Sequence, residues 1–305
     1  MEEYISDNSL YIRSKNNSMI NRKMIGRVLG MLLFIELGMF LLCAGVSAGY
    51  GESDYKYFLY TCIINAVVGG LLLLCGRGAE NKMSRRDGYC VVTLSWVFFT
   101  FFGMLPFYFS GSIDTITNAF FETMSGFTTT GATILDDIES LSHGMLFWRS
   151  LTQWIGGLGI VFFTIAILPI FTTGGVQLFS AESTGVTHDR THPRINVMAK
   201  WLWTIYLVLT ISETVLLMFG GMSLFDAICQ SFATTATGGY STKQNSISYW
   251  NSPYIEYVVA IFMIVSSINF SLFLMCLKGK VSRLFKDEEL HWFLASVGIL
   301  TFLIT

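Results

Sequence analysis

Charged residues and prolines are scarce in this chain. Asp, Glu, Lys and Arg together make up 13% of its 305 residues, and only four residues are proline. A soluble domain carries about twice that share of charge, so the composition excludes an ordinary soluble protein. The net charge of −2 also provides no electrostatic footprint for nucleic-acid binding.

Cysteine pairs and metal-binding motifs are also missing. No CxxC pair occurs, and the i, i+4 pair His188 and His192 is followed by Pro193 with no acidic-histidine motif nearby. We therefore expect neither a cofactor nor a transition metal. The six cysteines lie in or beside apolar runs, where small buried thiols are common, and should be free: Cys43, Cys62, Cys75, Cys90, Cys229 and Cys276.

Apolar residues are what the chain has in abundance. They make up 52% of the sequence, including 26 phenylalanines, which predicts an all-α integral membrane protein in a lipid bilayer. A helix of about 20 apolar residues crosses a hydrocarbon core of ~30 Å. A seventh apolar run begins at Leu290. The six runs of suitable length before it are Ile25–Ser47, Tyr57–Cys75, Tyr89–Ser110, Met145–Phe171, Ala199–Phe219 and Tyr254–Leu277.

The basic residues alternate along these runs and predict the orientation. Lys and Arg in short loops stay on the cytoplasmic side. Clusters precede the first run, follow the second, precede the fifth and follow the sixth, which leaves only Lys56, Arg149 and Lys243 for the outer side. We expect a cytoplasmic N-terminus, a first run retained as an anchor, and segments 111–144 and 220–253 outside.

The segment NAFFETMSGFTTTGATIL, Asn118 to Leu135, has no Lys or Arg and is rich in small and hydroxyl residues. It lies between two predicted spans and indicates a loop that dips into the membrane. Irregular backbone at membrane depth is tolerated only where protein buries it or where it lines a water-filled cavity. Carbonyl groups exposed in this way can replace the water around an ion.

The same plan occurs twice. In each unit a short apolar helix, capped by Asp114 in the first and by Ser223 in the second, precedes a Thr- and Gly-rich stretch and then a further span. An alignment without gaps places Gly131 on Gly239. Helices this short cannot span the membrane, and each C-terminal end, directed toward the protein centre, favours a cation there.

The glycines point to an ion filter. Turning the chain outward while directing successive carbonyls to one axis needs backbone angles that Gly131 and Gly239 can adopt. The ligands would be uncharged oxygens, which suit alkali ions better than divalent ions. Ordinary extracellular turns are the alternative for a single copy of such a stretch, but the paired occurrence favours the filter.

The residues also resemble a known family. The stretch FFETMSGFTTTGATIL with FWRSLTQWIGGLGIVFFTIAILPIF is similar to the first pore repeat of the TrkH family of potassium transporter subunits. LFSAESTGVTHDRTHPRINVMAKWLWTIYL resembles that family's linker, and TATGGYSTKQNSISYWNSPYIEYVVAIFMIVSSINFSL resembles its second repeat. The resemblance covers nearly the whole chain.

The resemblance implies potassium uptake through a carbonyl-lined filter across a bacterial inner membrane, with no enzymatic activity. It also implies a homodimer and a cytoplasmic nucleotide-binding regulatory subunit of the TrkA type. Two helices precede the first repeat, as in the Trk branch; a Ktr-type sodium-linked transporter subunit is the alternative. Mapped onto this sequence, the filter residues are Thr129, Thr130, Gly131 and Ala132 in the first strand and Thr237, Gly238, Gly239 and Tyr240 in the second.

The implied domain organisation is two N-terminal helices followed by potassium-channel-like repeats of helix, pore loop and helix. The N-terminal region is 1–88, the first repeat 89–177, the cytoplasmic linker 178–198 and the second repeat 199–277. Residues 278–305 form a cytoplasmic loop and the start of an incomplete third repeat, whereas the family carries four repeats. We expect an N-terminal fragment of a longer product; the alternative is a pore to which two chains each contribute two loops.

Four acidic residues in apolar surroundings are candidates for function, because buried charge is costly. Glu122 and Asp226 lie on the short helices, where supporting the filter from behind is as reasonable as contacting the ion. Glu36 and Glu213 lie away from the proposed path and are interpreted as structural. Arg149 follows a run of acidic residues at 136–139 and is predicted to form a surface ion pair there.

Two further patterns have less specific interpretations. An intramembrane serine hydrolase is the rival function, suggested by Ser125 and His143, but a nucleophile needs a base within hydrogen-bond reach and no second motif places His143 there. Gly156, Gly157 and Gly159 follow no strand, so they indicate close helix packing and not a nucleotide loop.

Overall fold

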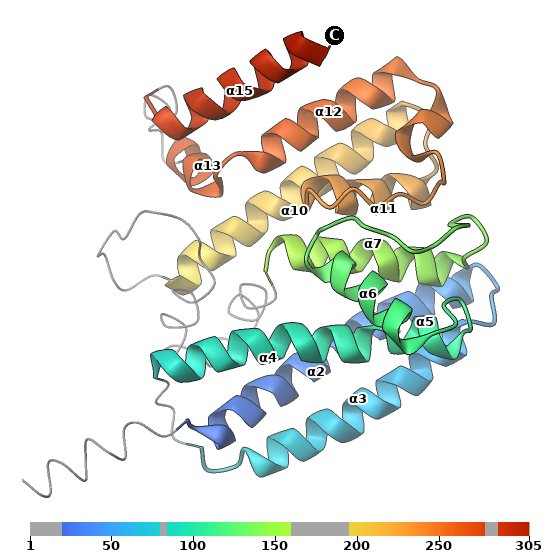
Figure 1. Cartoon of the computed structure of the whole chain (residues 1–305), viewed down its shortest axis with the longest axis vertical. Coiled ribbons are helices and arrows are strands. Elements are labelled where there is room, and N and C mark those ends of the chain that lie inside the picture. The colour runs from blue at the N-terminus through green and yellow to red at the C-terminus, as the bar shows by residue number, and fades with distance from the viewer. Residues whose placement is uncertain (1–19, 80–83, 160–194, 278–285, 305) are drawn as a thin grey trace, which may run out of the picture.

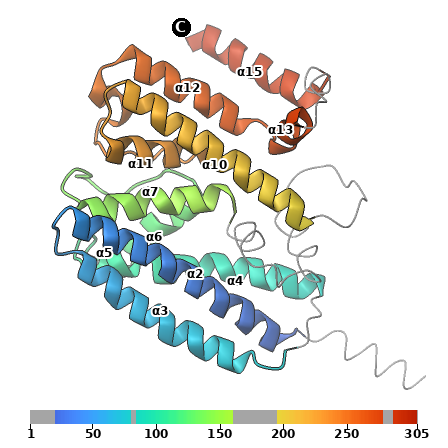
Figure 2. The same cartoon turned by 180° about the vertical axis from the view of Figure 1, so that it is seen from behind.

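The structure, a computed structural model, describes residues 20–79, 84–159, 195–277 and 286–304. Within these residues every regular element is a helix, which confirms the predicted fold class. The longer helices lie alongside one another, as Figures 1 and 2 show from two sides. The helices are α2 Arg22–Gly49, α3 Tyr55–Cys75, α4 Arg85–Gly103, α5 Leu105–Phe109, α6 Ile116–Phe127, α7 His143–Gly157, α10 Ile195–Phe219, α11 Leu224–Thr235, η2 Ser246–Trp250, α12 Pro253–Ser267, α13 Phe270–Leu277 and α15 Glu288–Ile304.

Long apolar helices occur where four of the spans are predicted. Among the described residues, four helical segments are long and apolar enough to cross a membrane: Arg22–Gly49, Tyr55–Cys75, Arg86–Phe109 and Trp201–Phe219. The predicted span Met145–Phe171 begins within α7, and its residues beyond 159 lie outside the described part of the chain.

The predicted span Tyr254–Leu277 is not one unbroken helix. Helix α12 ends at Ser267, Ile268 is extended with ψ 141°, and α13 begins at Phe270. The physical reason lies in the local sequence, since β-branched Ile268 and Asn269 both have weak helix propensity. The Asn269 carbonyl then accepts a 2.9 Å hydrogen bond from the Leu272 N–H, which starts the next helix.

The two N-terminal helices form a closely packed pair. A Cβ atom on Gly30 of α2 would lie 2.8 Å from the carbonyl oxygen of Gly69 on α3, so glycine permits the approach. At its start, α2 is joined to α4, because the Asn21 N–H donates a 2.8 Å hydrogen bond to Asp87. These contacts hold α2 against both α3 and α4.

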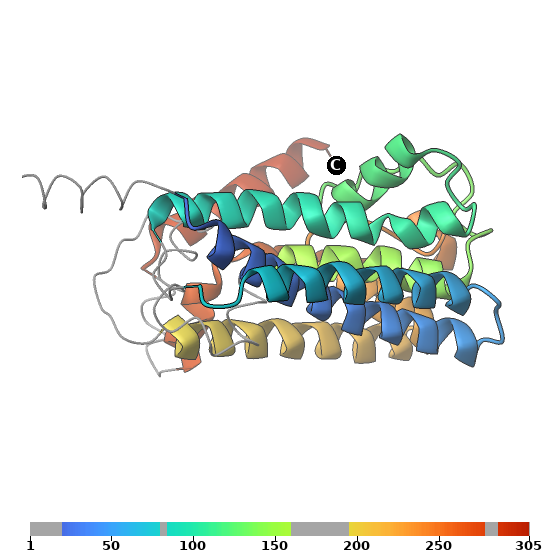
Figure 3. The same cartoon turned by 90° about the horizontal axis from the view of Figure 1, so that it is seen from below.

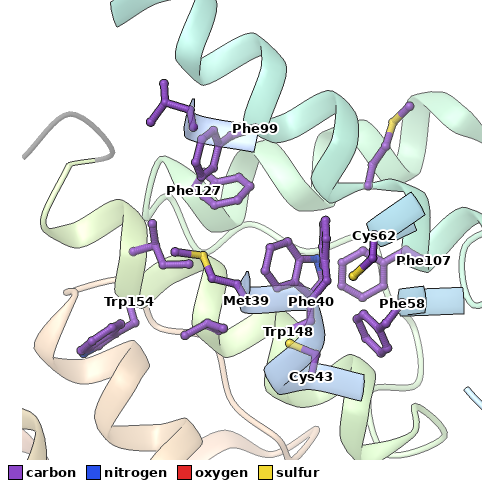
Figure 4. Close-up of a cluster of buried hydrophobic side chains, with 14 of the residues drawn as sticks. Met39, Phe40, Cys43, Phe58, Cys62, Phe99, Phe107, Phe127, Trp148 and Trp154 are labelled. Carbon is purple, nitrogen blue, oxygen red and sulfur yellow. The ribbon is translucent and has the colours of Figure 1, made fainter. Parts of the chain in front are cut away.

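The core lies around Trp148 of α7, as Figure 4 shows. Its ring centroid is 4.6 Å from that of Phe40 on α2 and 6.0 Å from that of Phe127 at the end of α6. The indole N–H donates a 2.8 Å hydrogen bond to the Gly103 carbonyl at the end of α4. One buried side chain therefore joins α2, α4, α6 and α7, and places the end of α6 where the candidate site begins.

The cysteines are free, as predicted. Their expected burial is confirmed for Cys43, Cys62 and Cys229, whereas Cys75 is exposed and Cys90 and Cys276 are partly exposed.

Candidate functional site

Helices α6 and α11 are the predicted short helices that precede the Thr- and Gly-rich stretches. Each has 12 residues and rises about 18 Å, too little to cross a ~30 Å core. Seen from below in Figure 3, α6 is inclined to the long helices. Ser223 caps α11 as predicted, but Asp114 does not cap α6; Thr115 does, accepting a 3.2 Å bond from the Asn118 N–H.

The chain leaves both helices by the same route. The Thr129 and Thr130 N–H groups donate to the carbonyls of Gly126 and Ser125 at 3.0 and 2.9 Å. In the second unit, the Thr237 and Gly238 N–H groups donate to the carbonyls of Thr234 and Ala233 at 2.9 and 2.8 Å. These four bonds join equivalent positions of the gapless alignment.

Backbone angles repeat in the same register. Gly131 and Gly239 have φ values of 76° and 83°, as their predicted role requires. Thr129 and Thr237 also have positive φ, 53° and 55°, a conformation that is uncommon for β-branched residues. The sequence interpretation named these two threonines as filter residues but did not predict their positive φ, because among residue types only glycine commonly adopts it.

The hydrogen bonds fix the direction of several carbonyls. A peptide group is planar and trans, so the C=O of one residue points opposite to the N–H of the next. The Thr130 and Gly238 N–H groups turn back to the short helices, so the carbonyls of Thr129 and Thr237 face away from them. The Tyr240 N–H donates to Gln153 Oε1 at 3.1 Å, which directs the Gly239 carbonyl away from α7.

The two strands, residues 129–132 and 237–240, meet at Gly131. A Cβ atom on Gly131 would overlap the carbonyl oxygen of Gly238, whereas nothing lies within 4 Å of a Cβ atom on Gly239. Glycine is therefore required at position 131 for its positive φ and because a side chain would not fit there. At position 239 it is required for the positive φ alone.

Glu122 is hydrogen-bonded to the residues that directly follow the first strand. The carboxylate is buried and accepts bonds from the Thr133 hydroxyl at 2.9 Å and from the Ile134 N–H at 3.0 Å. Its third partner is Arg149 of α7, whose Nε lies 2.8 Å from Glu122 Oε1.

The predicted surface ion pair of Arg149 is wrong. Its side chain is only 2% exposed, and it pairs with Glu122. The acidic residues at 136–139 are nearer in sequence, but α7 lies in the middle of the packed helices and directs Arg149 inward. Long-range pairing of this kind leaves no local sequence signal.

Asp226 is hydrogen-bonded to Thr242, shortly after the second strand. Its Oδ1 accepts a 2.6 Å bond from the Thr242 hydroxyl, and its Oδ2 accepts a 2.8 Å bond from the capping residue Ser223. Glu213 of α10 is buried and accepts a 3.3 Å bond from the Thr235 hydroxyl at the end of α11. Glu36 pairs instead with Asn65 between α2 and α3, at 3.1 Å.

Ala132 differs from the other strand residues. Its carbonyl oxygen accepts hydrogen bonds from Ser125 Oγ at 2.6 Å and from the Tyr240 hydroxyl at 3.2 Å. Ser125 is the main donor to this oxygen, because the single Tyr240 O–H is shared with the nearer Glu122 carbonyl. Tyr240 is itself buried, and its hydroxyl also contacts the Glu122 carbonyl at 2.9 Å.

The glycines of α7 allow close packing against both units, as predicted. A Cβ atom on Gly156 would overlap the Phe127 carbonyl oxygen at the end of α6. A Cβ atom on Gly157 would lie 2.7 Å from the Ala236 Cα at the end of α11. Helix α7 thus positions both helix ends at once.

Comparisons with known proteins identify the family at this point. The description "TrkH: Cation transport protein" belongs to the family profile that matches residues 55–305. The chain belongs to the TrkH family. This result confirms the family resemblance seen in the sequence segments.

Relatives and a solved structure extend this match. The chain is 40% identical over 273 residues to the "Trk system potassium uptake protein TrkH" of Escherichia coli (strain K12), which covers 88% of this chain and 56% of that protein. It is 36% identical over 285 residues to the protein of the same name from Halomonas elongata, covering 92% and 59%. The crystal structure of the potassium transporter TrkH from Vibrio parahaemolyticus matches with a TM-score of 0.79 and 33% identity, covering 94% and 58%. The chain therefore spans just over half the length of these TrkH proteins.

The remaining sequence candidates do not form the alternative sites that the sequence suggested. Ser125 donates to the Ala132 carbonyl, and the His143 ring lies 2.8 Å from Glu52, so these two residues do not form the pair that a serine hydrolase needs. His188 and His192 lie outside the described residues. Within the described ranges, no group of three or more His, Cys, Asp or Glu side chains could hold a metal ion.

Proposed function

We propose that this chain takes part in potassium uptake as the transmembrane subunit of a Trk-type system. Segments 129–132 and 237–240 would be parts of a carbonyl-lined selectivity filter. The observation that carries the proposal is the repeated backbone: positive φ at Thr129 and Gly131 recurs at Thr237 and Gly239. Two unrelated turns would have no reason to share this register.

The hydrogen bonds of the two strands limit which backbone carbonyls can serve as the proposed ion ligands. The carbonyls of Thr129, Thr237 and Gly239 are turned away from the helices behind them, as an ion path requires. The Ala132 carbonyl is occupied by Ser125 and Tyr240, so in this proposal Ala132 links the two strands and does not bind the ion. Thr130, Gly131 and Gly238 complete the proposed lining, and Glu122 and Asp226 support it.

In the proposed mechanism, potassium loses its water at these carbonyls and moves inward. The C-terminal ends of α6 and α11 each carry about half a negative charge and favour a cation. The membrane potential adds about 2.3 kcal/mol per elementary charge per 100 mV. One positive-φ glycine per strand gives few layers of ligands, so we expect weaker discrimination against sodium than in a potassium channel.

The membrane, the orientation of the chain and its assembly are also part of the proposal. The N-terminus would be cytoplasmic and the membrane a bacterial inner membrane, with residues 1–88, 89–177, 178–198, 199–277 and 278–305 forming the successive parts of the chain. A homodimer that docks a TrkA-type nucleotide-binding subunit is the proposed assembly. Helices α2 and α3, which precede the first repeat, favour this branch over a sodium-linked Ktr-type subunit.

Growth of a potassium-uptake-deficient strain at low potassium tests the function. The gene product should restore growth, and Gly131→Ser should abolish the rescue because the new side chain would meet the Gly238 carbonyl at a positive-φ position. Gly45→Ser is the matched control, since a Cβ atom there meets nothing within 4 Å. Rescue by Gly131→Ser at normal protein levels would overturn the proposal, and uptake that requires sodium would favour the Ktr-type alternative.

A further inference from the structure

Arg149 contacts parts of both repeats at once. Its Nε lies 2.8 Å from Glu122 Oε1 on α6, in the first unit. Its Nη1 donates a 3.0 Å hydrogen bond to the Ser241 carbonyl, which follows the second strand directly. The guanidinium carbon also lies 3.6 Å from the centroid of the Tyr240 ring, within the second strand.

Two of the three partners of Arg149, Glu122 and Tyr240, are themselves joined to the first strand or to the residues that follow it. Glu122 accepts bonds from the Thr133 hydroxyl and the Ile134 N–H, just after that strand. The Tyr240 hydroxyl donates to the Ala132 carbonyl at 3.2 Å. The guanidinium therefore lies at the centre of a network that spans both strands.

These contacts need an arginine. A guanidinium has a flat face that stacks on an aromatic ring and donors in its plane that reach a carboxylate and a carbonyl together. A lysine ammonium is a point charge and would keep the attraction to Glu122 without the stacked face and the planar donors. The pair of opposite charges is neutral as a unit, so its effect on an ion in the path is mainly one of positioning.

We propose that Arg149 is a positioning residue that holds the two proposed filter strands in register and thereby sets the discrimination between potassium and sodium. The proposal rests on the proposed filter. If the two strands shift relative to one another, the carbonyl cage changes in size and stiffness, and discrimination between the two ions falls. Transport itself continues, because the lining carbonyls remain.

The alternative role is purely structural. A buried ion pair can contribute to folding alone, and a broken pair destabilises a protein strongly. That role predicts a loss of protein without any change in the selectivity of the molecules that fold. The ratio of rubidium to sodium uptake, with rubidium as a tracer for potassium, separates the two roles because it does not depend on the amount of protein.

The experiment compares Arg149→Lys with the wild type, using the full gene product in cells without other potassium uptake systems. We expect the rubidium-to-sodium ratio to fall about tenfold while the rubidium uptake per molecule changes little. Lys56→Gln is the control, since Lys56 is an exposed basic residue; its ratio should equal that of the wild type. A wild-type ratio in folded Arg149→Lys would overturn the proposal.

A second variant decides the case if Arg149→Lys does not fold. Tyr240→Phe keeps the ring beneath the guanidinium and removes the hydroxyl that reaches the Ala132 and Glu122 carbonyls, both in the first unit. A reduced ratio in this variant supports the cross-link between the strands, and an unchanged ratio overturns it.

Gly131→Ser distinguishes failure of this inference from failure of the proposed function. If Gly131→Ser abolishes uptake while both other variants keep the wild-type ratio, the filter stands and the role of Arg149 is wrong. If Gly131→Ser also leaves uptake unchanged, the proposed filter itself is wrong.

Discussion

The two units that contain α6 and α11 share a backbone turn after the short helix but differ in the side-chain contacts around it. The alignment that pairs Gly131 with Gly239 also pairs Glu122 with Gln230. Glu122 holds three partners, including the buried Arg149. Gln230 donates to the Thr234 hydroxyl at 3.2 Å, and its Oε1 has no hydrogen-bond partner among the described residues.

This difference shows that the turn of the chain and its support are separate features. Helix-end bonds and positive φ angles define the turn in both repeats. The contacts involve a buried ion pair in the first unit and Asp226, in the first turn of α11, in the second. Substitutions at equivalent positions should therefore have unequal effects.

The largest difference in stability is expected between the variants Glu122→Gln and Gln230→Met. Loss of the Glu122 charge leaves Arg149 buried without a counter-charge, which costs about 3–5 kcal/mol. Gln230→Met removes one hydrogen bond, for a cost of about 1 kcal/mol. Thermal unfolding of the purified variants in detergent measures both changes. Equal losses of stability would show that the two supports are equivalent.

Next in size is the difference between Gly131→Ala and Gly239→Ala. Both substitutions place a side chain at a positive φ, which costs about 1–2 kcal/mol. Only Gly131→Ala also meets a carbonyl, that of Gly238, so we expect it to abolish rubidium uptake while Gly239→Ala retains part of it. Uptake per molecule measures this, and the reverse order would contradict the close approach of the two strands.

A smaller effect is expected for Asp226→Asn. The capping bond, which the Asp226 N–H donates to Ser223 Oγ, is unchanged, but the side chain loses the charge that strengthens the bonds it accepts from Thr242 and Ser223. We expect a loss of about 1 kcal/mol, well below that of Glu122→Gln. The comparison of unfolding midpoints tests this; a larger loss than for Glu122→Gln would reverse the ranking of the two supports.

The smallest effect on stability is expected for Glu52, which lies in the loop that connects α2 to α3. Partial burial alone would raise the pKa of Glu52, but hydrogen bonds from the His143 and Gly144 N–H groups and from the His143 ring outweigh it and lower the pKa. The contribution of Glu52 to stability is therefore present above the unfolded-state value of about 4.3. It is lost as the pH falls through the lower folded-state value.

Unfolding midpoints across pH test this contact. Glu52→Gln should be slightly less stable than the wild type at neutral pH, and the two should converge in acid. A difference that stays constant down to low pH would argue against an ionised Glu52 in the folded protein.

Local signals predicted much of the fold and part of the site. Hydrophobic runs located the long helices, and the gapless alignment located equivalent turns, because both depend on residues close in sequence. Ser223 was identified as a cap on the same basis. At Asp114 the prediction was one residue early, since Thr115 is an equally good capping residue.

Contacts between residues far apart in the sequence could not be predicted from local sequence patterns. The pairing of Arg149 with Glu122 and the bond from Tyr240 to Ala132 depend on how α7 packs between α6 and α11. The break at Ile268 had a weak signal in Asn269, but apolar neighbours on both sides favoured one continuous helix. Such features need the tertiary structure.

The most direct test of the central claim is a crystal structure of the full gene product with rubidium, whose anomalous scattering locates the ion. The proposed filter predicts a rubidium peak at coordination distance from the carbonyls of Thr129 and Thr237, and loss of that peak in Gly131→Ser. Rubidium bound elsewhere along the path, with none between these two strands, would contradict the claim.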